Sequence, residues 1–511
     1  MAATQRSFAD LLVAMTVLEL HGDPGDVAVA AVTQDSRTAT VGSCFVAVPG
    51  FRVDGHDFLR KARCAGARTF VVQADHRALW APMLEQPDGV VAVVPDTRAA
   101  LADLAAAFHG YPARALTVVG VTGTDGKSTT CYLVSAILEA AGHRTGLIGG
   151  VQFKVGDEWR MNDLTQTSPE SPLVQKLLAE MVEAGVTHAV VESTSHGLAL
   201  NRLDHCEFDV AVFTGLSDDH LDFHQTREAY RDAKAELFRA LDTSLEKGAP
   251  KRGVVNADDV EAGFFVAATK APVVRVGLDD SDLDVTATDL IELPSGSTFT
   301  LCTPAGEAPV QLVLPARFNV RNALAAAGAG HALGVAPAAI AAGLGAVRSV
   351  PGRMESIDCG QPFAVVVDAA ATTDALRVVL ESVRPLVQGR LILVFGCAGE
   401  RDPSRRSGMG VVAAELSDYS VLTSENPRSE EPAAIVREIA MAMEAAGRRV
   451  GEDFEEEPDR RAAIARALDL ARAGDTVIIA GKGTEQTLIF AESIESWDDR
   501  AVTRALLIDR S

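Results

Sequence analysis

The sequence predicts an α/β protein made of three domains. With 511 residues the chain is too long for one hydrophobic core, and about three domains are expected. The composition is that of an ordinary globular protein, with 47% apolar and 23% charged residues. Short apolar runs alternate with helical patterns throughout, and breaks near 112 and 350 divide the chain into regions 1–112, 113–350 and 351–511.

The first region is predicted to be a small α/β domain. Its strand-like runs are 44–48, 69–72 and 90–94, and its helical patterns are 57–65 and 97–108. The segment His-Gly-Tyr-Pro at 109–112 has the composition of a linker and ends the region.

The second region alternates strands and helices, which predicts a parallel sheet with helices on both faces. The expected strands are 115–121, 188–193, 210–214, 253–256 and 273–276. The expected helices are 127–141, 171–184 and the alanine-rich 319–333. Between 284 and 315, short β-like runs interrupt this alternation.

The third region repeats the α/β pattern. Buried strands are expected at 364–367, 391–395, 420–423 and 476–480. The acidic run 452–457 is interpreted as a solvated loop.

Charge and cysteine usage exclude several classes of function. A net charge of −23 would repel nucleic acid and anionic lipid, so we expect no nucleic-acid partner. Seven cysteines without a C-x-x-C pair indicate neither a zinc site nor a disulfide framework, which fits a reducing cytoplasm. No apolar run approaches the ~20 residues that a spanning helix needs. We expect no signal peptide and no integral membrane association.

The most informative segment is 120–130, Gly-Val-Thr-Gly-Thr-Asp-Gly-Lys-Ser-Thr-Thr. A glycine-rich turn between a strand and a helix directs backbone N–H groups and the positive helix end into one concavity. Lys127 can reach β- and γ-phosphates, and Ser128 offers a hydroxyl to Mg²⁺. Val121 stands where the strict pattern has glycine, so a tight turn with an incidental lysine is the competing interpretation. The segment predicts a nucleoside triphosphate site.

Two further groups follow strands of the second region. Glu192 ends one strand, at the sheet edge where ligands gather, and we expect it to hold Mg²⁺. A helix N-cap box over 192–196 is the alternative, and the role of His196 stays open. The cluster 218–224, Asp-Asp-His-Leu-Asp-Phe-His, follows the next strand, which favours His220 near a second cation.

These motifs, with others in all three regions, resemble the Mur ligase family, ATP-dependent enzymes that add amino acids to the peptidoglycan precursor. The family's phosphate loop is the shorter Gly-Thr-x-Gly-Lys-Ser/Thr form, which accounts for Val121. The similarity covers nearly the whole chain. The matching segments are 35–37, 49–50, 54–56, 123–129, 192–197, 219–224, 230–238, 256–259, 318–322, 351–355, 395–406, 425–428 and 481–483.

The resemblance implies an N-terminal domain that binds the UDP-sugar, a central P-loop ATPase domain and a C-terminal Rossmann-like domain that brings the amino acid. The implied ATP-binding residues are Gly123, Thr124, Asp125, Gly126, Lys127, Ser128, Thr129, Asn319, Asn322 and Arg353. The implied UDP-sugar-binding residues are Ser36, Thr167, Ser168, Thr194 and Arg202. The implied amino-acid-binding residues are Arg401, Glu425, Asn426, Arg428, Gly481 and Glu485.

The resemblance further implies that Lys127, Glu192, His220 and Lys234 are catalytic. Two Mg²⁺ would be held by Ser128, Glu192, His220 and Lys234. Family members carbamylate the lysine at the position of Lys234 with CO₂, and the new carboxylate supplies oxygen ligands that a hard cation prefers. From the helical pattern alone Lys234 would be interpreted as a surface residue.

The reaction implied by the resemblance joins a diamino acid to UDP-MurNAc-L-Ala-D-Glu through an acyl phosphate, in a protein that we expect to be a monomer. The segment 425–428 is similar to the Asp-Asn-Pro-Arg motif of members that add meso-diaminopimelate. Arg428 can hold the extra carboxylate of this amino acid bidentately. Lysine and ornithine remain alternatives, and Arg428 could instead form an ion pair with Glu430 or Glu431.

Several positions depart from the family pattern. Ala369, Ala370 and Ala371 stand where members carry Tyr-Ala-His, and Thr484 replaces a histidine. These changes keep two alternatives open: a divergent ligase for another acyl acceptor, such as a folylpolyglutamate synthase, and a nucleotide-binding pseudo-ligase. The motif at 35–37 argues against folate.

Overall fold

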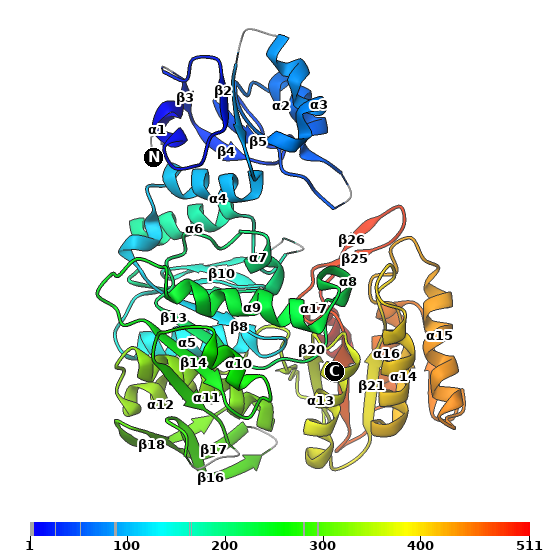
Figure 1. The fold of residues 1–511 in the computed structure, drawn as a ribbon. Coiled ribbons are helices and arrows are strands. Elements are labelled where there is room, and N and C mark those ends of the chain that lie inside the picture. The colour runs from blue at the N-terminus through cyan, green and yellow to red at the C-terminus, as the bar shows by residue number, and fades with distance from the viewer. Residues whose placement is uncertain are drawn as a thin grey trace.

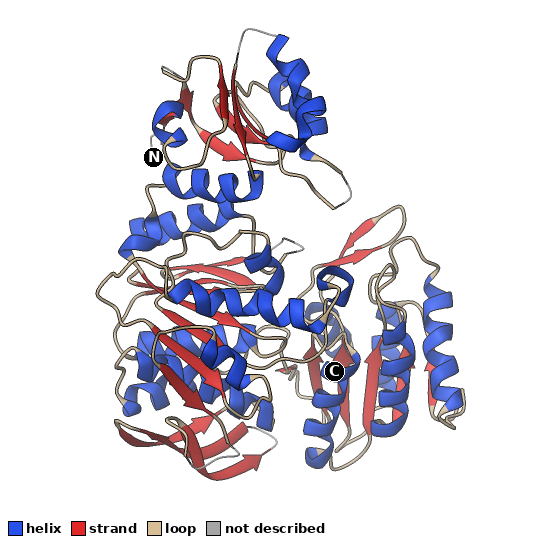
Figure 2. Cartoon of the chain, viewed as in Figure 1, coloured by secondary structure: helices blue, strands red, loops and turns tan. Residues whose placement is uncertain are grey.

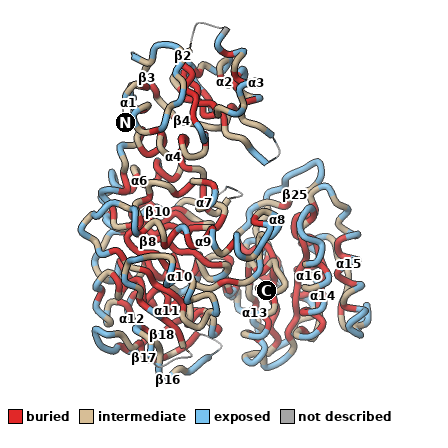
Figure 3. Tube along the Cα trace, in the orientation of Figure 1, coloured by how far each residue is buried: buried red, intermediate tan, exposed pale blue. Residues whose placement is uncertain are grey.

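The computed structural model describes residues 5–510, except 26, 52, 86–88, 163, 165, 279–281 and 294–295. The chain forms three α/β domains, with the N-terminal and C-terminal domains attached to different sides of the central one (Figure 1). Each domain has its own sheet with helices packed against it (Figure 2). The strands form the buried interior of each domain (Figure 3), because a parallel sheet covered on both faces has no solvent-facing side. Within the described part, no helix is long and apolar enough to cross a bilayer.

The N-terminal domain contains a five-stranded sheet in the order β2-β7-β6-β5-β4, of which only β2 is antiparallel to its neighbour. The strands are β2 (Glu19–His21), β4 (Ala31–Thr33), β5 (Ser43–Val46), β6 (Thr69–Gln73) and β7 (Val90–Val94). The helices are α1 (Phe8–Leu12), α2 (Leu59–Cys64), α3 (Arg77–Trp80) and α4 (Thr97–Phe108), and a short pair joins β1 (Arg6–Ser7) to β3 (Ala28–Val29). The predicted helix 57–65 is split, because residues 55–58 form a 3₁₀ turn first.

The central domain contains an eight-stranded sheet in the order β11-β10-β9-β12-β8-β13-β14-β15. The strands are β8 (Thr117–Thr122), β9 (Thr145–Ile148), β10 (Gln152–Val155), β11 (Glu158–Met161), β12 (His188–Glu192), β13 (Val210–Phe213), β14 (Arg252–Asn256) and β15 (Val273–Val276). The prediction of a purely parallel sheet is wrong at one edge, where β10 and β11 are antiparallel. The loops at 149–151 and 156–157 are too short for the crossover that parallel strands need.

Helices cover both faces of this sheet, as predicted. One face packs against α5 (Lys127–Ala140) and α11 (Arg317–Ala332), and α12 (Pro337–Ala346) packs on the outside of α5. The other packs against α6 (Ser171–Glu183), α9 (Arg227–Leu241) and α10 (Ala262–Ala267). The predicted interruption is confirmed as an antiparallel sheet of β16 (Thr286–Leu293), β17 (Gly296–Thr303) and β18 (Gly306–Leu312). Two short helices, α7 (Ser195–Ala199) and α8 (Leu221–His224), follow the C-terminal ends of β12 and β13.

The C-terminal domain contains a six-stranded sheet in the order β19-β20-β24-β21-β22-β23, parallel except at β19. Its strands are β19 (Glu355–Ser356), β20 (Ala364–Asp368), β21 (Leu391–Phe395), β22 (Tyr419–Leu422), β23 (Phe454–Glu456) and β24 (Thr476–Ala480), followed by the hairpin β25 (Thr487–Ile489) and β26 (Ile494–Ser496). Its helices are α13 (Thr373–Val383), α14 (Ser404–Leu416), α15 (Pro432–Ala445), α16 (Arg460–Leu470) and α17 (Asp499–Ile508). The interpretation of 452–457 as a loop is wrong, because the buried ring of Phe454 anchors edge strand β23 within the acidic run.

Candidate active site

The phosphate loop lies between β8 and α5, at the C-terminal edge of the central sheet. Gly123 and Gly126 have φ of +146° and +81°. A Cβ would lie 2.0 Å from Thr214 Oγ1 at the first position and 2.2 Å from Asn322 Oδ1 at the second. Only glycine fits, and the turn brings the N-terminus of α5 beneath the loop. Lys127 Nζ donates to the carbonyl oxygens of Gly123 (3.1 Å) and Thr124 (2.7 Å).

A carboxylate from the neighbouring strand lies against this loop. Strand β12 pairs in parallel with β8, and Glu192 lies opposite Val121. Ser128 Oγ donates to Glu192 Oε1 at 3.0 Å, and the amide of Gly150 donates to Oε2 at 2.8 Å. Hydroxyl and carboxylate oxygens form a ligand set suited to Mg²⁺. The segment also caps a helix, because the side chain of Thr194 accepts a hydrogen bond from the amide of Gly197 at the start of α7.

Lys234 lies on the buried face of α9, so the surface interpretation from the helical pattern alone is wrong. Its side chain is 1% exposed, its Nζ lies 4.3 Å from the ring centroid of Tyr230, and it donates to Gly123 O at 2.6 Å. Burial, with a smaller contribution from nearby Lys127, holds the pKa of Lys234 well below its ordinary range. A neutral amine is nucleophilic, so the position fits a lysine that could add CO₂.

His220 precedes α8 in a left-handed conformation, with φ of +55°. Asp219 Oδ1 accepts from the amide of His220 at 2.8 Å, and Asp219 Oδ2 lies 3.4 Å from the ring Nε2. Burial lowers the pKa of His220 and thus favours the neutral form that ligates metals. His196, whose role the sequence left open, stacks on Phe223 with ring centroids 4.2 Å apart, and burial lowers its pKa to about 4.

A cavity of about 310 Å³ opens over the phosphate loop. Arg353 closes it from the C-terminal domain, and α11 contributes an asparagine pair in which Asn322 Nδ2 donates to Asn319 Oδ1 at 3.1 Å. Ala369 and Ala370 line the same cavity. Of the implied ATP-binding residues, all but Gly123 line it: Thr124, Asp125, Gly126, Lys127, Ser128, Thr129, Asn319, Asn322 and Arg353. Residues 214–217 form another wall of this cavity. The sequence did not indicate them as ATP-binding residues, because they carry no phosphate-loop pattern.

A second cavity, of about 250 Å³, lies between the phosphate loop and the C-terminal domain and shares Asp125, Ala369 and Ala375 with the first. Burial, with a further contribution from Glu485, raises the pKa of Glu425 to about 7. Five of the implied amino-acid-binding residues line this cavity: Arg401, Glu425, Asn426, Arg428 and Glu485. Gly481 is not among the lining residues, but a Cβ there would lie 3.6 Å from Glu425 Cγ.

Lys482 and Arg428 have distinct surroundings at this cavity. The buried Lys482 Nζ, which sequence reasoning did not assign, donates to Asn426 Oδ1 (3.0 Å) and Glu485 Oε2 (2.8 Å). Glu430 pairs with Arg406 at 2.7 Å. Among the described residues, no ion pair joins Arg428 to Glu430 or Glu431, and the backbone of Arg428 is held by Ile489. The guanidinium is therefore available to the cavity.

Four of the implied UDP-sugar residues gather behind Glu192. Ser168 Oγ donates to the carbonyl oxygen of Glu192 and lies 2.9 Å from Thr194 Oγ1. Arg202 Nη1 donates to Ser168 O at 3.2 Å and Nη2 pairs with Glu170 at 2.8 Å. Thr167 lies beside Gly150. The fifth, Ser36, is buried in the N-terminal domain, and the contacts of the described residues do not join it to this group.

Models of three protein domains match this chain in order. Residues 28–109 match the Mur ligase family catalytic domain, 121–330 the Mur ligase middle domain, and 352–483 the Mur ligase glutamate ligase domain. This chain belongs to the Mur ligase family. The UDP-N-acetylmuramyl-tripeptide synthetase of Roseiflexus sp. is 44% identical to it over 500 residues, and 96% of each chain is covered.

Two further comparisons place this Mur ligase more closely. The UDP-N-acetylmuramoyl-L-alanyl-D-glutamate–2,6-diaminopimelate ligase of Geobacillus kaustophilus is 42% identical over 490 residues, which cover 96% of each chain. A solved structure of a ligase of the same name has a TM-score of 0.66 and 28% identity, with 99% of each chain covered. The similarity to these relatives therefore extends over nearly the whole of this Mur ligase.

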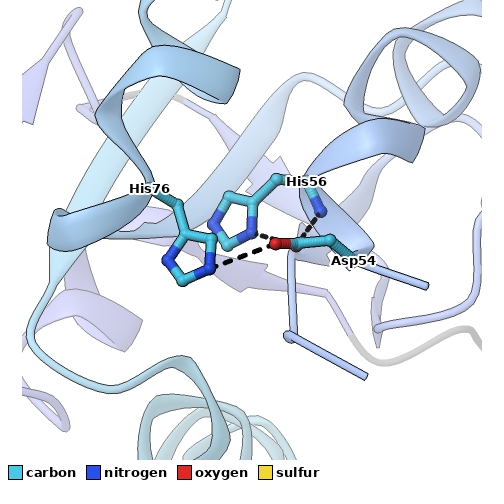
Figure 4. Close-up of side chains that lie close together, drawn as sticks. All are labelled: Asp54, His56 and His76. Atoms are coloured by element: carbon cyan, nitrogen blue, oxygen red, sulfur yellow. Dashed lines mark hydrogen bonds and ion pairs between the residues drawn. The ribbon is translucent and has the colours of Figure 1, made fainter. Parts of the chain in front are cut away.

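The N-terminal domain of this Mur ligase contains a histidine cluster of Asp54, His56 and His76 (Figure 4). These three residues are not among those that line the two cavities. Asp54 Oδ1 lies 2.6 Å from His56 Nδ1, and Asp54 Oδ2 lies 3.1 Å from His76 Nε2. The amide of Gln73 donates to His56 Nε2 at 3.0 Å. His56 Nδ1 must then carry the proton shared with Asp54, which leaves no free lone pair on this ring for a cation. The cluster is a hydrogen-bond network that holds segment 54–56 against β6.

Proposed function

We propose that this protein is an ATP-dependent ligase that joins meso-diaminopimelate to UDP-MurNAc-L-Ala-D-Glu in peptidoglycan precursor synthesis. The observation that carries this proposal is the junction of the two cavities at the phosphate loop. Phosphate-binding groups lie on one side of Asp125, and Arg428 lies on the other. The relatives' names provide independent support, because several with 38–43% identity are called diaminopimelate ligases of this precursor.

The geometry suits two cations as well as ATP. Ser128 and Glu192 would hold one Mg²⁺, and His220 with a carbamate on Lys234 would hold the second. Bound Mg²⁺ would neutralise phosphate charge during phosphoryl transfer. The buried, neutral amine of Lys234 supports the carbamate, since only an unprotonated amine can add CO₂.

The chain's own residues would act mainly by position and charge. The side-chain carboxylate of D-Glu attacks the γ-phosphate of ATP, the bond from the γ-phosphorus to the β–γ bridging oxygen breaks, and ADP leaves. Lys127, freed from the Gly123 and Thr124 carbonyls, meets the charge that spreads over the phosphoryl oxygens. The acyl phosphate forms near Asp125, where the cavities meet. The unprotonated amine of the diamino acid then attacks its carbonyl carbon, the bond from that carbon to the phosphate oxygen breaks, and the departing phosphate takes the proton that the amine loses. Ser128 and Cys397 line the two cavities, but Ser128 donates to Glu192 and burial raises the pKa of the Cys397 thiol, so neither is activated as a nucleophile. Proximity therefore carries the reaction.

The choice of diaminopimelate rests on charge within the second cavity. Arg428 and Arg401 offer guanidinium groups to the two carboxylates, and Glu425 and Glu485 offer carboxylates to an ammonium. Lysine and ornithine lack the second carboxylate and would leave Arg428 without a partner. For this reason we rank them below diaminopimelate.

The test is phosphate release by the purified protein with ATP, the dipeptide precursor and each amino acid in turn. We expect release with diaminopimelate and much less with lysine or ornithine. Release that needs no precursor would contradict the proposal. Nucleotide binding without turnover of any combination would favour a pseudo-ligase, the second candidate. Ala369 in the nucleotide cavity and Ala371 in the second cavity support it, because both replace the family's residues.

Three further expectations stay proposals. We propose domain boundaries at 1–112, 113–350 and 351–511, supported by the left-handed Tyr111 that separates α4 from the next turn. We expect a monomer. We also expect the protein to act in the cytoplasm, where the nucleotide precursor of our proposal would be made.

A further inference from the structure

The segment between β13 and α9 connects two domains. Helix α8 and the residues before it reach from the central domain towards the C-terminal domain (Figure 1). Arg405, in the first turn of α14, donates from Nη2 to Asp219 Oδ1 at 2.9 Å, and Arg401 lies 4.0 Å from Asp222. Side chains of the C-terminal domain thus hold a loop of the ATP domain.

Asp219 also holds His220. The carboxyl oxygen Oδ1 that receives Arg405 also accepts from the amide of His220 at 2.8 Å. The other oxygen lies 3.4 Å from His220 Nε2. Because His220 is not glycine, its left-handed backbone is unfavourable unless neighbours stabilise it. Asp219 thus stabilises the backbone of His220 and lies beside its ring.

Arg405 comes from a rigid frame. Its helix α14 packs between α13 and α15 on one face of the C-terminal sheet. The side chains of Arg405 and Asp219 are 26% and 16% exposed, so solvent screens this pair less than a surface ion pair. Arg405 also lines the second cavity beside Arg401 and Arg428. It therefore contacts the amino-acid site and the His220 loop at once.

We propose that Arg405 is a positioning residue, which acts through Asp219 to orient His220 towards the second cation while the C-terminal domain contacts this loop. The proposal rests on the proposed function, in which His220 ligates Mg²⁺. It differs from direct recognition, in which Arg405 would bind a carboxylate of the amino acid. The consequence is that occupation of the amino-acid cavity and assembly of the metal site depend on the same side chain.

The test is a double-mutant cycle of Arg405→Gln and Asp219→Asn in the full-length protein. The Asp219→Asn substitution keeps an oxygen for the amide of His220 but removes the ion pair. We expect each single variant to raise the Mg²⁺ concentration for half-maximal phosphate release by about tenfold, as loss of groups that orient a ligand does. The double variant should need no more Mg²⁺ for half-maximal release than the more affected single variant. Arg405→Lys should need nearly as little Mg²⁺ as the wild type.

A second measurement does not depend on turnover. Calorimetric titration measures the binding of a non-hydrolysable ATP analogue at several Mg²⁺ concentrations. The single variants should need more Mg²⁺ for tight binding than the wild type, and their effects should again be non-additive in the double variant. Arg437→Gln is the matched control, because Arg437 lies on α15 and pairs with Glu444 and Glu456 away from both cavities. Arg437→Gln should change neither the Mg²⁺ dependence of phosphate release nor that of analogue binding. Thermal unfolding checks that all variants fold.

The outcomes separate the alternatives. Additive losses, or a higher KM for diaminopimelate with unchanged Mg²⁺ dependence, would overturn the proposal in favour of direct recognition. If the wild-type protein releases no phosphate with any amino acid, the proposed function fails, while the calorimetric cycle still decides whether Arg405 acts through Asp219.

Discussion

Lys234 Nζ donates a 2.6 Å hydrogen bond to the carbonyl oxygen of Gly123. This contact joins the buried face of α9 to the phosphate loop, 111 positions earlier in the chain. It places an amine of lowered pKa where the second cation of our proposal would lie. The first prediction tests this relationship.

Replacing Lys234 should abolish most ligase activity while nucleotide binding persists. For Lys234→Met we expect a loss of about 10²–10³-fold in kcat, typical of removing one preorganised group that stabilises transition-state charge. Depleting CO₂ should lower wild-type activity, and added bicarbonate should restore it in the wild type only. Lys270→Met, at an exposed position of the same domain, is the control. Full wild-type activity without CO₂ would contradict the carbamate.

Gly126→Ala should disrupt the phosphate loop. The new Cβ would lie 2.2 Å from Asn322 Oδ1, at a φ of +81°. We expect weaker ATP binding and a loss of about 1–3 kcal/mol in the free energy of unfolding, from chemical denaturation. Gly142→Ala has a similar φ of +87° with nothing within 4 Å, so it separates backbone strain from the clash. Equal effects of the two substitutions would mean that the clash is relieved elsewhere.

Arg428→Lys should change the choice of amino acid. A lysine keeps the charge but cannot bind a carboxylate bidentately. We expect KM for diaminopimelate to rise by about 10–100-fold, the equivalent of losing a charge-assisted hydrogen bond, with little change in the KM for ATP. Steady-state kinetics with diaminopimelate and lysine measure this shift. An unchanged ratio of kcat/KM between the two amino acids would refute the role given to Arg428.

Glu425 should make stability depend on pH. Its pKa is raised to about 7, from an ordinary value of 4.5, mainly by burial. Because the folded state binds the proton more tightly, this group stabilises the fold fully below about pH 4.5, and the contribution is lost as pH rises through about 7.

Glu425→Gln should remove that dependence. At pH 8 we expect the variant to be more stable than the wild type by on the order of 1–3 kcal/mol. At pH 5 the difference in the free energy of unfolding between the two proteins should be smaller. Urea denaturation across this range measures the difference, with Glu431→Gln, on the exposed side of the same loop, as the control. A variant whose stability follows the wild-type pH curve would show that Glu425 titrates normally.

Patterns local in the chain were predictable. Strands 90–94, 273–276, 391–395 and 476–480 are confirmed to the residue. Three of them are buried, largely apolar runs bounded by turns, and 273–276 is an edge strand in which exposed Arg275 alternates with buried Val274 and Val276. The phosphate loop is also a local prediction, since its glycines, lysine and serine all lie within residues 123–128. Three strands towards the edges of the sheets were harder to predict. The strands β10 and β11 pair antiparallel, and β23 lies within an acidic run. The local sequence pattern does not show which neighbours such strands pair with.

The order of residues was enough to establish the fold class and to predict a phosphate loop, a metal-binding role for Glu192 and a cation near His220 in the segment 218–224. Two relationships needed the folded molecule: Lys234 is buried against Gly123, and Arg405 reaches Asp219 from another domain. The physical reason is that helical periodicity gives a side chain's direction around its helix but not what the helix packs against. The packing of α9 on the central sheet and the contact of α14 with the α8 loop join segments that are distant in the sequence. These contacts bring two basic side chains, Lys234 and Arg405, into the proposed site.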